Sequence, residues 1–286
     1  MRLAPLFDPV ITKNLMKSSG LRARRDRNAF SNALKRGLYE AIFRRRDIRQ
    51  FTPDPIPDEV LARVLIAAHH AASVGFTQPW DFIIVRDHER RRRVKEIFEA
   101  ERAKNAAQFT GARRKKFLSL KLEGILEAPL NVIVTCKPDR FGPGVLGKTS
   151  IREVEIYSAC LAVENLWLAA RVEGIGVGWV SILRNDALAT IFGIPGDVIP
   201  VAYLCLGYVS EFPDRPILAT AEWASRLPPR TLIHFDSWNG RKGAGPLKTP
   251  AHDLKSKQNL ESKIDDPSIW RAIFPADSID EPPSRE

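Results

Sequence analysis

The sequence predicts an α/β or α+β sandwich, in which helices flank a central sheet of buried strands. Short apolar runs, typical of buried strands, alternate with segments whose hydrophobic residues recur every three to four positions, as in an amphipathic helix. The chain also has 286 residues, 44% of them hydrophobic, which is enough for one sizeable core.

The first predicted elements are two helices separated by a proline-rich stop. Hydrophobic residues at helical spacing indicate a helix from Ser31, and the sequence TPDPIP ends it. A second helix begins beside Pro57, because proline suits the first turn of a helix and an apolar helical face follows it.

The remaining elements alternate from residue 80 onward. Strands are expected over 80–87, 129–136, 176–183 and 199–209, helices over 88–105, 114–127, 151–174 and 184–193, and a loop over 137–150. The longest of these helices is expected to end at Gly174, because glycine commonly follows a helix C-terminus.

The positive charge of the chain is concentrated near its N-terminal end. Residues 1–50 hold 13 Lys/Arg against 4 Asp/Glu, which accounts for nearly all of the net charge of +10. The remainder is close to neutral, so binding of nucleic acid over the whole surface is not expected. We expect a basic, flexible extension over 1–30, a folded domain over 31–238 and a polar, flexible tail over 239–286.

The cysteines and apolar runs predict a cytoplasmic protein without membrane association. Cys136, Cys160 and Cys205 are odd in number and lack CxxC spacing, which is typical of free thiols in a reducing compartment. No apolar run reaches membrane-spanning length, and no cluster has metal-ligand spacing, so no metal site is predicted. The GxGxxG match at 142–147 neither follows a strand directly nor opens a helix, which favours an ordinary loop.

The stretch RRRDIRQF, residues 44–51, places one carboxylate, Asp47, among four arginines. Positive side chains suit the negative end of a helix dipole, whereas a carboxylate does not. Asp47 could simply pair with a neighbouring arginine. Alternatively, the arginines could bind a phosphate or an electron-rich ring and leave Asp47 facing the ligand. The residues alone leave both interpretations open.

Two further stretches place polar residues or glycines beside strands. SVGFTQPW, residues 73–80, joins a helix to a strand, and its polar side chains could either meet a ligand or cap the loop's own backbone. In GIGVGWVS, residues 174–181, Gly176 and Gly178 predict the close approach of another group. Ser181 ends that strand, where a serine is most simply a surface hydroxyl.

Taken together, these stretches resemble the nitroreductase-like flavoprotein superfamily, and more closely its BluB family, 5,6-dimethylbenzimidazole synthase. The resemblance covers roughly residues 35–238, and several motifs agree in order and spacing. RRD stands where ordinary nitroreductases usually have RRS. The matching residues are Arg45-Arg46-Asp47, Ser73-Val74-Gly75, Gln78-Pro79-Trp80, Lys121, Glu123-Gly124-Ile125, Asn165 to Arg171, Gly178-Trp179-Val180-Ser181, Leu204 to Gly207 and Glu211-Phe212.

The resemblance implies a nitroreductase-like sandwich with a mixed central sheet, and FMN bound at a homodimer interface. The implied reaction is oxygen-dependent, with reduced FMN as the substrate rather than a retained cofactor. Its ring system is fragmented and contracted to 5,6-dimethylbenzimidazole, the lower ligand of cobalamin, and erythrose 4-phosphate is released. NAD(P)H would act only indirectly, for example through a partner flavin reductase.

The resemblance also assigns roles to residues. Asp47 would be a general base, and Ser181 would hydrogen-bond near the flavin edge that reacts with oxygen. The expected flavin-binding residues are Arg45, Arg46, Arg49, Ser73, Gly75, Gln78, Lys121, Gly178 and Arg226, the last for the phosphate.

Two other functions are alternatives. An ordinary FMN-dependent NAD(P)H oxidoreductase of the nitroreductase type would retain FMN as a cofactor and tolerate Asp47 among its arginines. A basic binding module would use residues 1–50. The segment 147–158 departs from the BluB pattern, which bears on how the flavin is covered.

Overall fold

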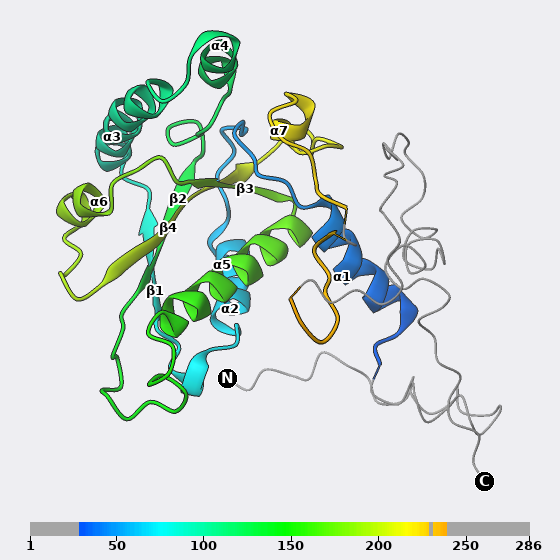
Figure 1. Ribbon diagram of the computed structural model, residues 1–286, viewed down its shortest axis with the longest axis vertical. Coiled ribbons are helices and arrows are strands. Elements are labelled where there is room, and N and C mark those ends of the chain that lie inside the picture. Colours follow the sequence, from blue (N-terminus) through cyan, green and yellow to red (C-terminus); the bar gives the residue numbers. More distant parts are fainter. Residues whose placement is uncertain (1–28, 229–230, 239–286) are drawn as a thin grey trace. The chain divides into compact units, whose positions relative to one another are not determined.

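The computed structural model describes residues 29–228 and 231–238. The chain divides into two compact units, residues 1–40 and 41–286, and the boundary falls inside helix α1 (Asn32–Arg44). The sheet and the helices that cover it belong to the second unit (Figure 1). The predicted extension and the predicted C-terminal tail lie outside the described residues, except for residues 29 and 30.

Four strands form one sheet in the order β1-β2-β4-β3 (Figure 1). They are β1 (Trp80–Val85), β2 (Leu130–Cys136), β3 (Ile175–Val180) and β4 (Ile199–Tyr208). All three neighbouring pairs are antiparallel. Among the described residues, the parallel part expected of a mixed sheet is one isolated bridge between Asp47 and Val177, on the free side of β3.

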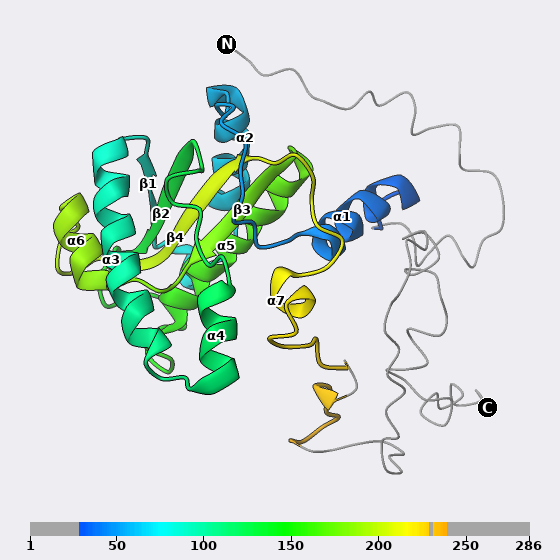
Figure 2. The same ribbon diagram turned by 90° about the horizontal axis from the view of Figure 1, so that it is seen from above.

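Helices cover both faces of the sheet, two on each (Figure 2). One face carries α2 (Asp58–His69) and α5 (Val154–Val172), and the other carries α3 (His88–Ala106) and α6 (Asn185–Phe192). Along β2, Val132 and Val134 join the core under α2 and α5, whereas Ile133 joins the core under α3 and α6. Every residue of β2 is buried, which explains why its sequence is apolar except for Asn131 and Thr135.

The helix predicted over 114–127 was wrong in its second half. Helix α4 spans only Gly111–Ser119, and a turn follows it. The buried carboxylate of Glu123 fixes this turn, since it accepts a hydrogen bond from the N–H of Ile125 at 2.8 Å and pairs with Lys95 at 2.5 Å. A side chain that binds backbone in this way competes with helix formation.

The other differences from the predicted boundaries are small. Helix α5 begins at Val154 rather than 151, and β3 ends at Val180 rather than 183, so Ser181 lies just beyond the strand. Two short elements, η3 (Val74–Phe76) and α7 (Ile217–Thr220), complete the described structure. None of the described helices is both long and apolar enough to cross a membrane.

Candidate functional site

The glycines of β3 admit a neighbouring segment of the same chain. A Cβ atom on Gly178 would lie 2.0 Å from the carbonyl oxygen of Ile48. The N–H of Ile48 donates to the carbonyl of Val177 at 2.9 Å, beside the parallel bridge of Asp47. The close approach predicted at Gly178 is therefore made by the chain's own backbone, and a contact between Gly178 and the cofactor stays a prediction.

Asp47 is held between β3 and Arg49. Its Oδ1 accepts a hydrogen bond from the N–H of Trp179 at 3.0 Å, and its Oδ2 accepts one from Nη2 of Arg49 at 2.5 Å. The same Nη2 donates to the carbonyl of Trp179 at 2.6 Å. Asp47 thus pairs with an arginine, yet its side chain remains 45% exposed and can still meet a ligand.

The surroundings of Asp47 favour its protonated form. Burial raises the pKa of Asp47 above its ordinary value, and the charge of Arg49 and the N–H of Trp179 offset only part of this rise. A carboxyl group with a raised pKa exchanges protons closer to neutral pH than an ordinary aspartate does. This property suits a general acid or base.

One donor of the Arg49 side chain is left without a partner in the described part of the chain. Its side chain is only 10% exposed. Its Nη1 is buried and has no hydrogen-bond partner among the described residues. Since an unpaired buried donor of a charged group is costly, a ligand atom that accepts from Nη1 would stabilise this arrangement.

Further arginines gather around Arg46, the residue before Asp47. Burial lowers the pKa of Arg46, and the charges of Arg45, Arg226 and Arg171 lower it further. A concentration of positive charge of this kind attracts anions, and guanidinium groups match the geometry of a phosphate.

Arg46 itself is occupied by backbone. Its Nε and Nη2 donate to the carbonyls of Pro213 and Asp214 at 3.0 and 2.5 Å, and its Nη1 donates to those of Phe43 and Arg45, both at 2.8 Å. These bonds tie the segment that follows β4 to the end of α1. Arg46 therefore contributes charge to the site while its donors bind backbone carbonyls, and its expected role as a flavin ligand stays a prediction.

Trp167 of α5 supports the arginines, and sequence reasoning did not single it out. The guanidinium of Arg45 lies over its ring, 4.8 Å from the centroid, and its Nε1 donates to the carbonyl of Arg46 at 3.2 Å. Arg45 also lies 3.8 Å from the carboxylate of Glu164. In the sequence, Trp167 could have been noticed as one large aromatic residue on a helix whose buried face is mostly alanine, valine and leucine.

The polar residues of SVGFTQPW cap their own loop. Oγ of Ser73 accepts from the N–H of Gln78 at 3.0 Å, and the side-chain amide of Gln78 donates to the carbonyl of Phe76 at 3.0 Å. Gly75 has a φ of +52°, and a Cβ there would lie 2.8 Å from a methyl group of Val145. These bonds are the ones that the capping interpretation expects, and contact of the loop with a ligand stays a prediction. The close neighbour of Gly75 is another loop.

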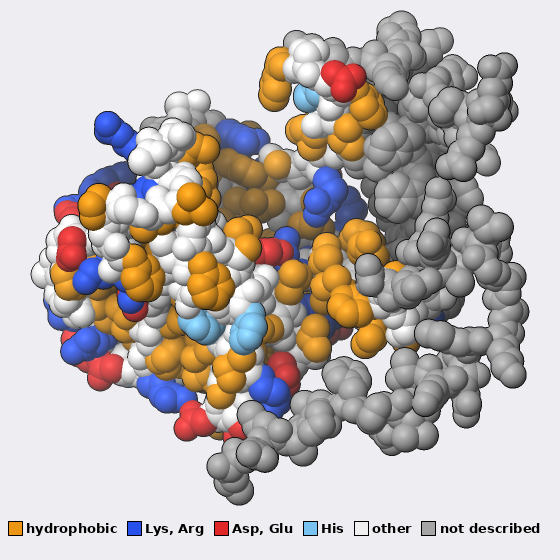
Figure 3. Space-filling model, turned by 90° about the horizontal axis from the view of Figure 1, so that it is seen from below, with side chains coloured by type: hydrophobic (Ala, Val, Ile, Leu, Met, Phe, Trp, Pro, Cys, Tyr) orange, Lys and Arg blue, Asp and Glu red, His pale blue; other side chains and the backbone are white. Residues whose placement is uncertain are grey.

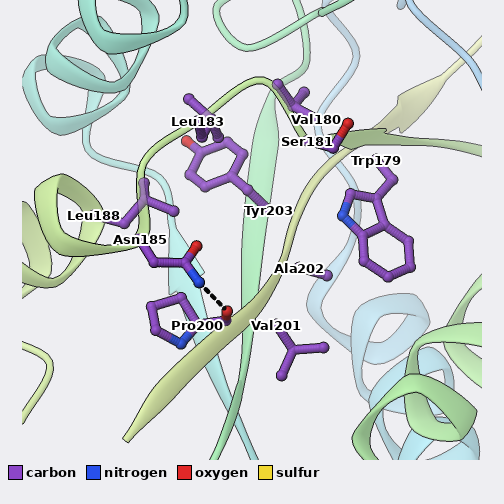
Figure 4. A pocket seen from close by; sticks show the side chains of 10 residues that line it. All are labelled: Trp179, Val180, Ser181, Leu183, Asn185, Leu188, Pro200, Val201, Ala202 and Tyr203. Carbon is purple, nitrogen blue, oxygen red and sulfur yellow. Dashed lines mark hydrogen bonds between the residues drawn. The ribbon is translucent and has the colours of Figure 1, made fainter. Parts of the chain in front are cut away.

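Ser181 lies just beyond β3 and lines a pocket of about 190 Å³ (Figure 4). The pocket lies where β3 and β4, paired as far as Val180 and Tyr203, diverge. Trp179 and Ser181 lie on one side of it, and Leu188 and Pro200 lie on the opposite side (Figure 4). Because Asp47 binds the backbone of Trp179, both predicted catalytic residues come to the same end of β3.

Lys121 lies on the turn that supports Arg49. It forms an ion pair with Glu127. Three residues later, a Cβ on Gly124 would lie 3.0 Å from the carbonyl oxygen of Arg49, so this turn packs directly on the site segment.

The predicted flavin-binding residues form two groups at opposite ends of α5. Near its start, Ser158 accepts a hydrogen bond from the N–H of Val74 in the 73–78 loop, at 3.2 Å. Near its end, Trp167 holds Arg45 and Arg46. At 1.5 Å per residue, Ser158 and Trp167 are roughly 13 Å apart along the helix axis. The structure therefore brings Asp47, the arginines and Ser181 together, but it does not bring the 73–78 loop to them.

The sequence matches the model of a known family of proteins. The model of the nitroreductase family matches residues 42–208, and the chain belongs to this family. It is 37% identical to the 5,6-dimethylbenzimidazole synthase of Rhodospirillum rubrum, over 80% of this chain and 97% of that protein. It is 36% identical to the 5,6-dimethylbenzimidazole synthase of Rhodobacter capsulatus, over 70% of this chain and 96% of that protein.

A solved structure has the same fold. The NADPH:FMN oxidoreductase from Vibrio harveyi, complexed with NAD⁺, superimposes with a TM-score of 0.55 over 72% of this chain and 80% of that chain. The two sequences are 19% identical, so this likeness concerns the fold alone.

Proposed function

We propose that this protein is a 5,6-dimethylbenzimidazole synthase, which consumes reduced FMN and dioxygen and releases 5,6-dimethylbenzimidazole, erythrose 4-phosphate and the four-carbon pyrimidine remainder of the flavin. The observation that carries the proposal is Asp47, a partly exposed acid with a raised pKa, fixed to β3 beside a buried guanidinium nitrogen that has no partner among the described residues. The activity is also that of the relatives at 36% and 37% identity.

FMN fits the residues that are present. Nη1 of Arg49 would donate to the pyrimidine edge of the ring system, where reduced flavin carries negative charge. Arg45 and Arg226 would bind the phosphate, and the charge of Arg46 would strengthen the attraction. Reduced FMN supplies both the carbon skeleton and the electrons of the reaction.

Asp47 would remove a proton from the bound substrate at a carboxylate oxygen. The N–H of Trp179 and Nη2 of Arg49 each hold one of its oxygens, so the carboxylate is oriented before the substrate arrives. Burial, which raises its pKa, then helps it to retain the proton. The hydroxyl of Ser181, at the same end of β3, would hydrogen-bond near the flavin edge that meets dioxygen.

Two copies of the chain would complete each site. Ser73 and Gln78 lie at the opposite end of α5 from the arginines, so they would meet the flavin bound by a second copy. Hydrophobic side chains at the surface agree with such an interface (Figure 3). In α5 and at the end of α1, exposed fractions of 40% to 56% are found for Ile42, Phe43, Tyr157 and Leu161.

The decisive experiment mixes the purified protein with chemically reduced FMN in air and measures 5,6-dimethylbenzimidazole by mass spectrometry. Prereduced flavin makes the assay independent of the NAD(P)H-dependent reductase that we propose as a partner. The wild-type chain should form the product, and Asp47→Asn should bind FMN without forming it. Turnover of nitroaromatics with NAD(P)H, and no benzimidazole, would instead identify an oxidoreductase that retains FMN.

The shared site can be tested separately by mixing two inactive chains. Gly75→Val should distort the 73–78 loop, because Gly75 has positive φ and no room for a side chain. A dimer of one Asp47→Asn chain and one Gly75→Val chain contains one site in which both parts are wild-type. Co-expression should therefore restore about a quarter of the wild-type sites if chains pair at random. Failure to restore activity in an isolated mixed dimer would contradict the shared site.

A further inference from the structure

Two buried polar side chains in the first turns of α5 each bond a different loop. Glu155 is 1% exposed and Ser158 is 3% exposed. Oε2 of Glu155 lies 2.7 Å from Nζ of Lys148 and accepts a hydrogen bond from the N–H of Asp139 at 3.3 Å. Oγ of Ser158 accepts from the N–H of Val74 at 3.2 Å. Residues three apart share a helix face, so one face of α5 anchors both loops.

The two anchored loops also pack on each other. The site of a Cβ on Gly75 is 2.8 Å from a methyl group of Val145 and 3.0 Å from the carbonyl oxygen of Leu146. A Cβ on Gly147 would in turn lie 3.3 Å from a methyl group of Val74. A shift of either loop by a fraction of an ångström is therefore transmitted to the other.

A simpler explanation of Glu155 does not account for its burial. An acid in the first turn favours the helix dipole, but it does so equally well at the surface. Glu155 is almost fully buried, and its Oε1 has no hydrogen-bond partner among the described residues. Burying a carboxylate in this way is costly. Its position is explained if holding Lys148 and Asp139 is its role, since Lys148 also pairs with the carboxylate of Asp139.

The anchored loops hold two large apolar side chains out to solvent. Phe76 is 81% exposed and Leu146 is 84% exposed, although each belongs to a loop fixed to α5. Large apolar groups held outward on fixed loops are typical of a surface that meets a ligand or another chain.

We propose that Glu155 and Ser158 are positioning residues, which lock the 73–78 loop and the 145–148 loop to α5 and so fix the surface that closes over FMN in the partner copy. This inference rests on the proposed function, because it assumes that the 73–78 loop meets FMN. It assigns a role to the segment 147–158, where the sequence departs from its family.

The test compares single and double variants by FMN binding and by thermal stability. Lys148→Met leaves the carboxylate of Glu155 buried without its cation, so it should lower both Tm and affinity for FMN. The double variant Lys148→Met/Glu155→Gln buries no unpaired charge, so its Tm should recover, whereas its loops remain unanchored. We expect Kd for oxidised FMN, measured well below Tm, to be about tenfold raised in the single and the double variant alike.

Ser158→Ala should raise Kd for FMN as well, since it removes the acceptor of the Val74 N–H. Lys137→Met is the matched control, because Lys137 is 44% exposed and lies 3.9 Å from Asp197 in a surface ion pair. It should change neither Tm nor Kd.

The inference is overturned if the double variant recovers wild-type Kd for FMN together with wild-type Tm. It is also overturned if Kd for FMN is unchanged in Lys148→Met, the double variant and Ser158→Ala. If the double variant stays unstable, steady-state kinetics distinguish a positioning role from a loss of folded protein. A raised KM for reduced FMN with kcat retained supports positioning, and a fall in kcat that follows the folded fraction contradicts it. Binding of oxidised FMN does not require benzimidazole formation, so failure of the proposed reaction would be seen separately.

Discussion

Gly178→Ala tests whether the fit of the Ile48 segment against β3 builds the site. The added methyl group would lie 2.0 Å from the carbonyl oxygen of Ile48, whereas ordinary contact begins at 3.4 Å. The segment must therefore retreat by about 1.4 Å, because β3 is held in the sheet and the segment is at its edge. That movement breaks the 2.9 Å hydrogen bond from Ile48 to Val177 and displaces Asp47 and Arg49 from Trp179.

The size of the effect follows from these bonds. Three lost hydrogen bonds cost about 3 kcal/mol, and replacing a strand glycine by alanine returns about 1 kcal/mol. The net loss of about 2 kcal/mol corresponds to a fall in Tm of about 4–8 °C for a domain of this size. Formation of 5,6-dimethylbenzimidazole should fall about 100-fold, because a base displaced by about 1 Å is poorly placed for proton transfer.

Differential scanning fluorimetry and the mass-spectrometric assay measure the two effects on one preparation. Gly196→Ala is the control, because no atom lies within 4 Å of its Cβ position and its φ is ordinary. Its Tm and activity should match wild-type. Wild-type stability and activity in Gly178→Ala would refute the reasoning, since the segment would then not depend on this contact.

Three further predictions concern the charged residues of the site. Because burial raises the pKa of Asp47 above 3.8, and the carboxylate is the active base, kcat/KM should rise with pH through that raised pKa and stay level above it. A kcat/KM that is independent of pH throughout the acidic range would contradict this role. Arg46→Lys should lower the free energy of unfolding by about 2 kcal/mol, as much as Arg46→Ala, because a lysine cannot donate to four carbonyls at once. A wild-type Tm of Arg46→Lys in thermal melts would contradict this prediction. Arg226→Ala should weaken FMN binding about tenfold and leave riboflavin binding unchanged, because riboflavin lacks the phosphate. An equal loss of affinity for both ligands in fluorescence titrations would exclude a phosphate contact.

The strands were predictable because both faces of the sheet are covered. Residues 130–136 are buried throughout, and the run LNVIVTC is apolar at all but two positions, so it could be recognised. The turn after α4 was not predictable, because it depends on Glu123 reaching the N–H of Ile125 and Lys95 of α3. Local helical spacing contains no information about such tertiary contacts.

The site was predictable in part. The glycines of β3 correctly indicated a close approach, but the sequence could not show that Ile48, 130 residues before Gly178, makes it. The arginine cluster was evident, whereas the use of Arg46 by four carbonyls depends on where residues 213 and 214 return to α1. The separation of the 73–78 loop from Asp47 required the length and direction of α5.

Helix α5 sets the spacing between two functional ends of the chain. It fixes Val74 through Ser158 near one end and the arginines through Trp167 near the other, with no loop between them. One residue inserted between these positions would shift one end by about 1.5 Å and turn it by about 100° about the axis. In a symmetric pair both catalytic centres would then be misaligned at once. On the proposed function, the length of α5 therefore fixes the distance between the loop that meets one flavin and the arginines that bind the other.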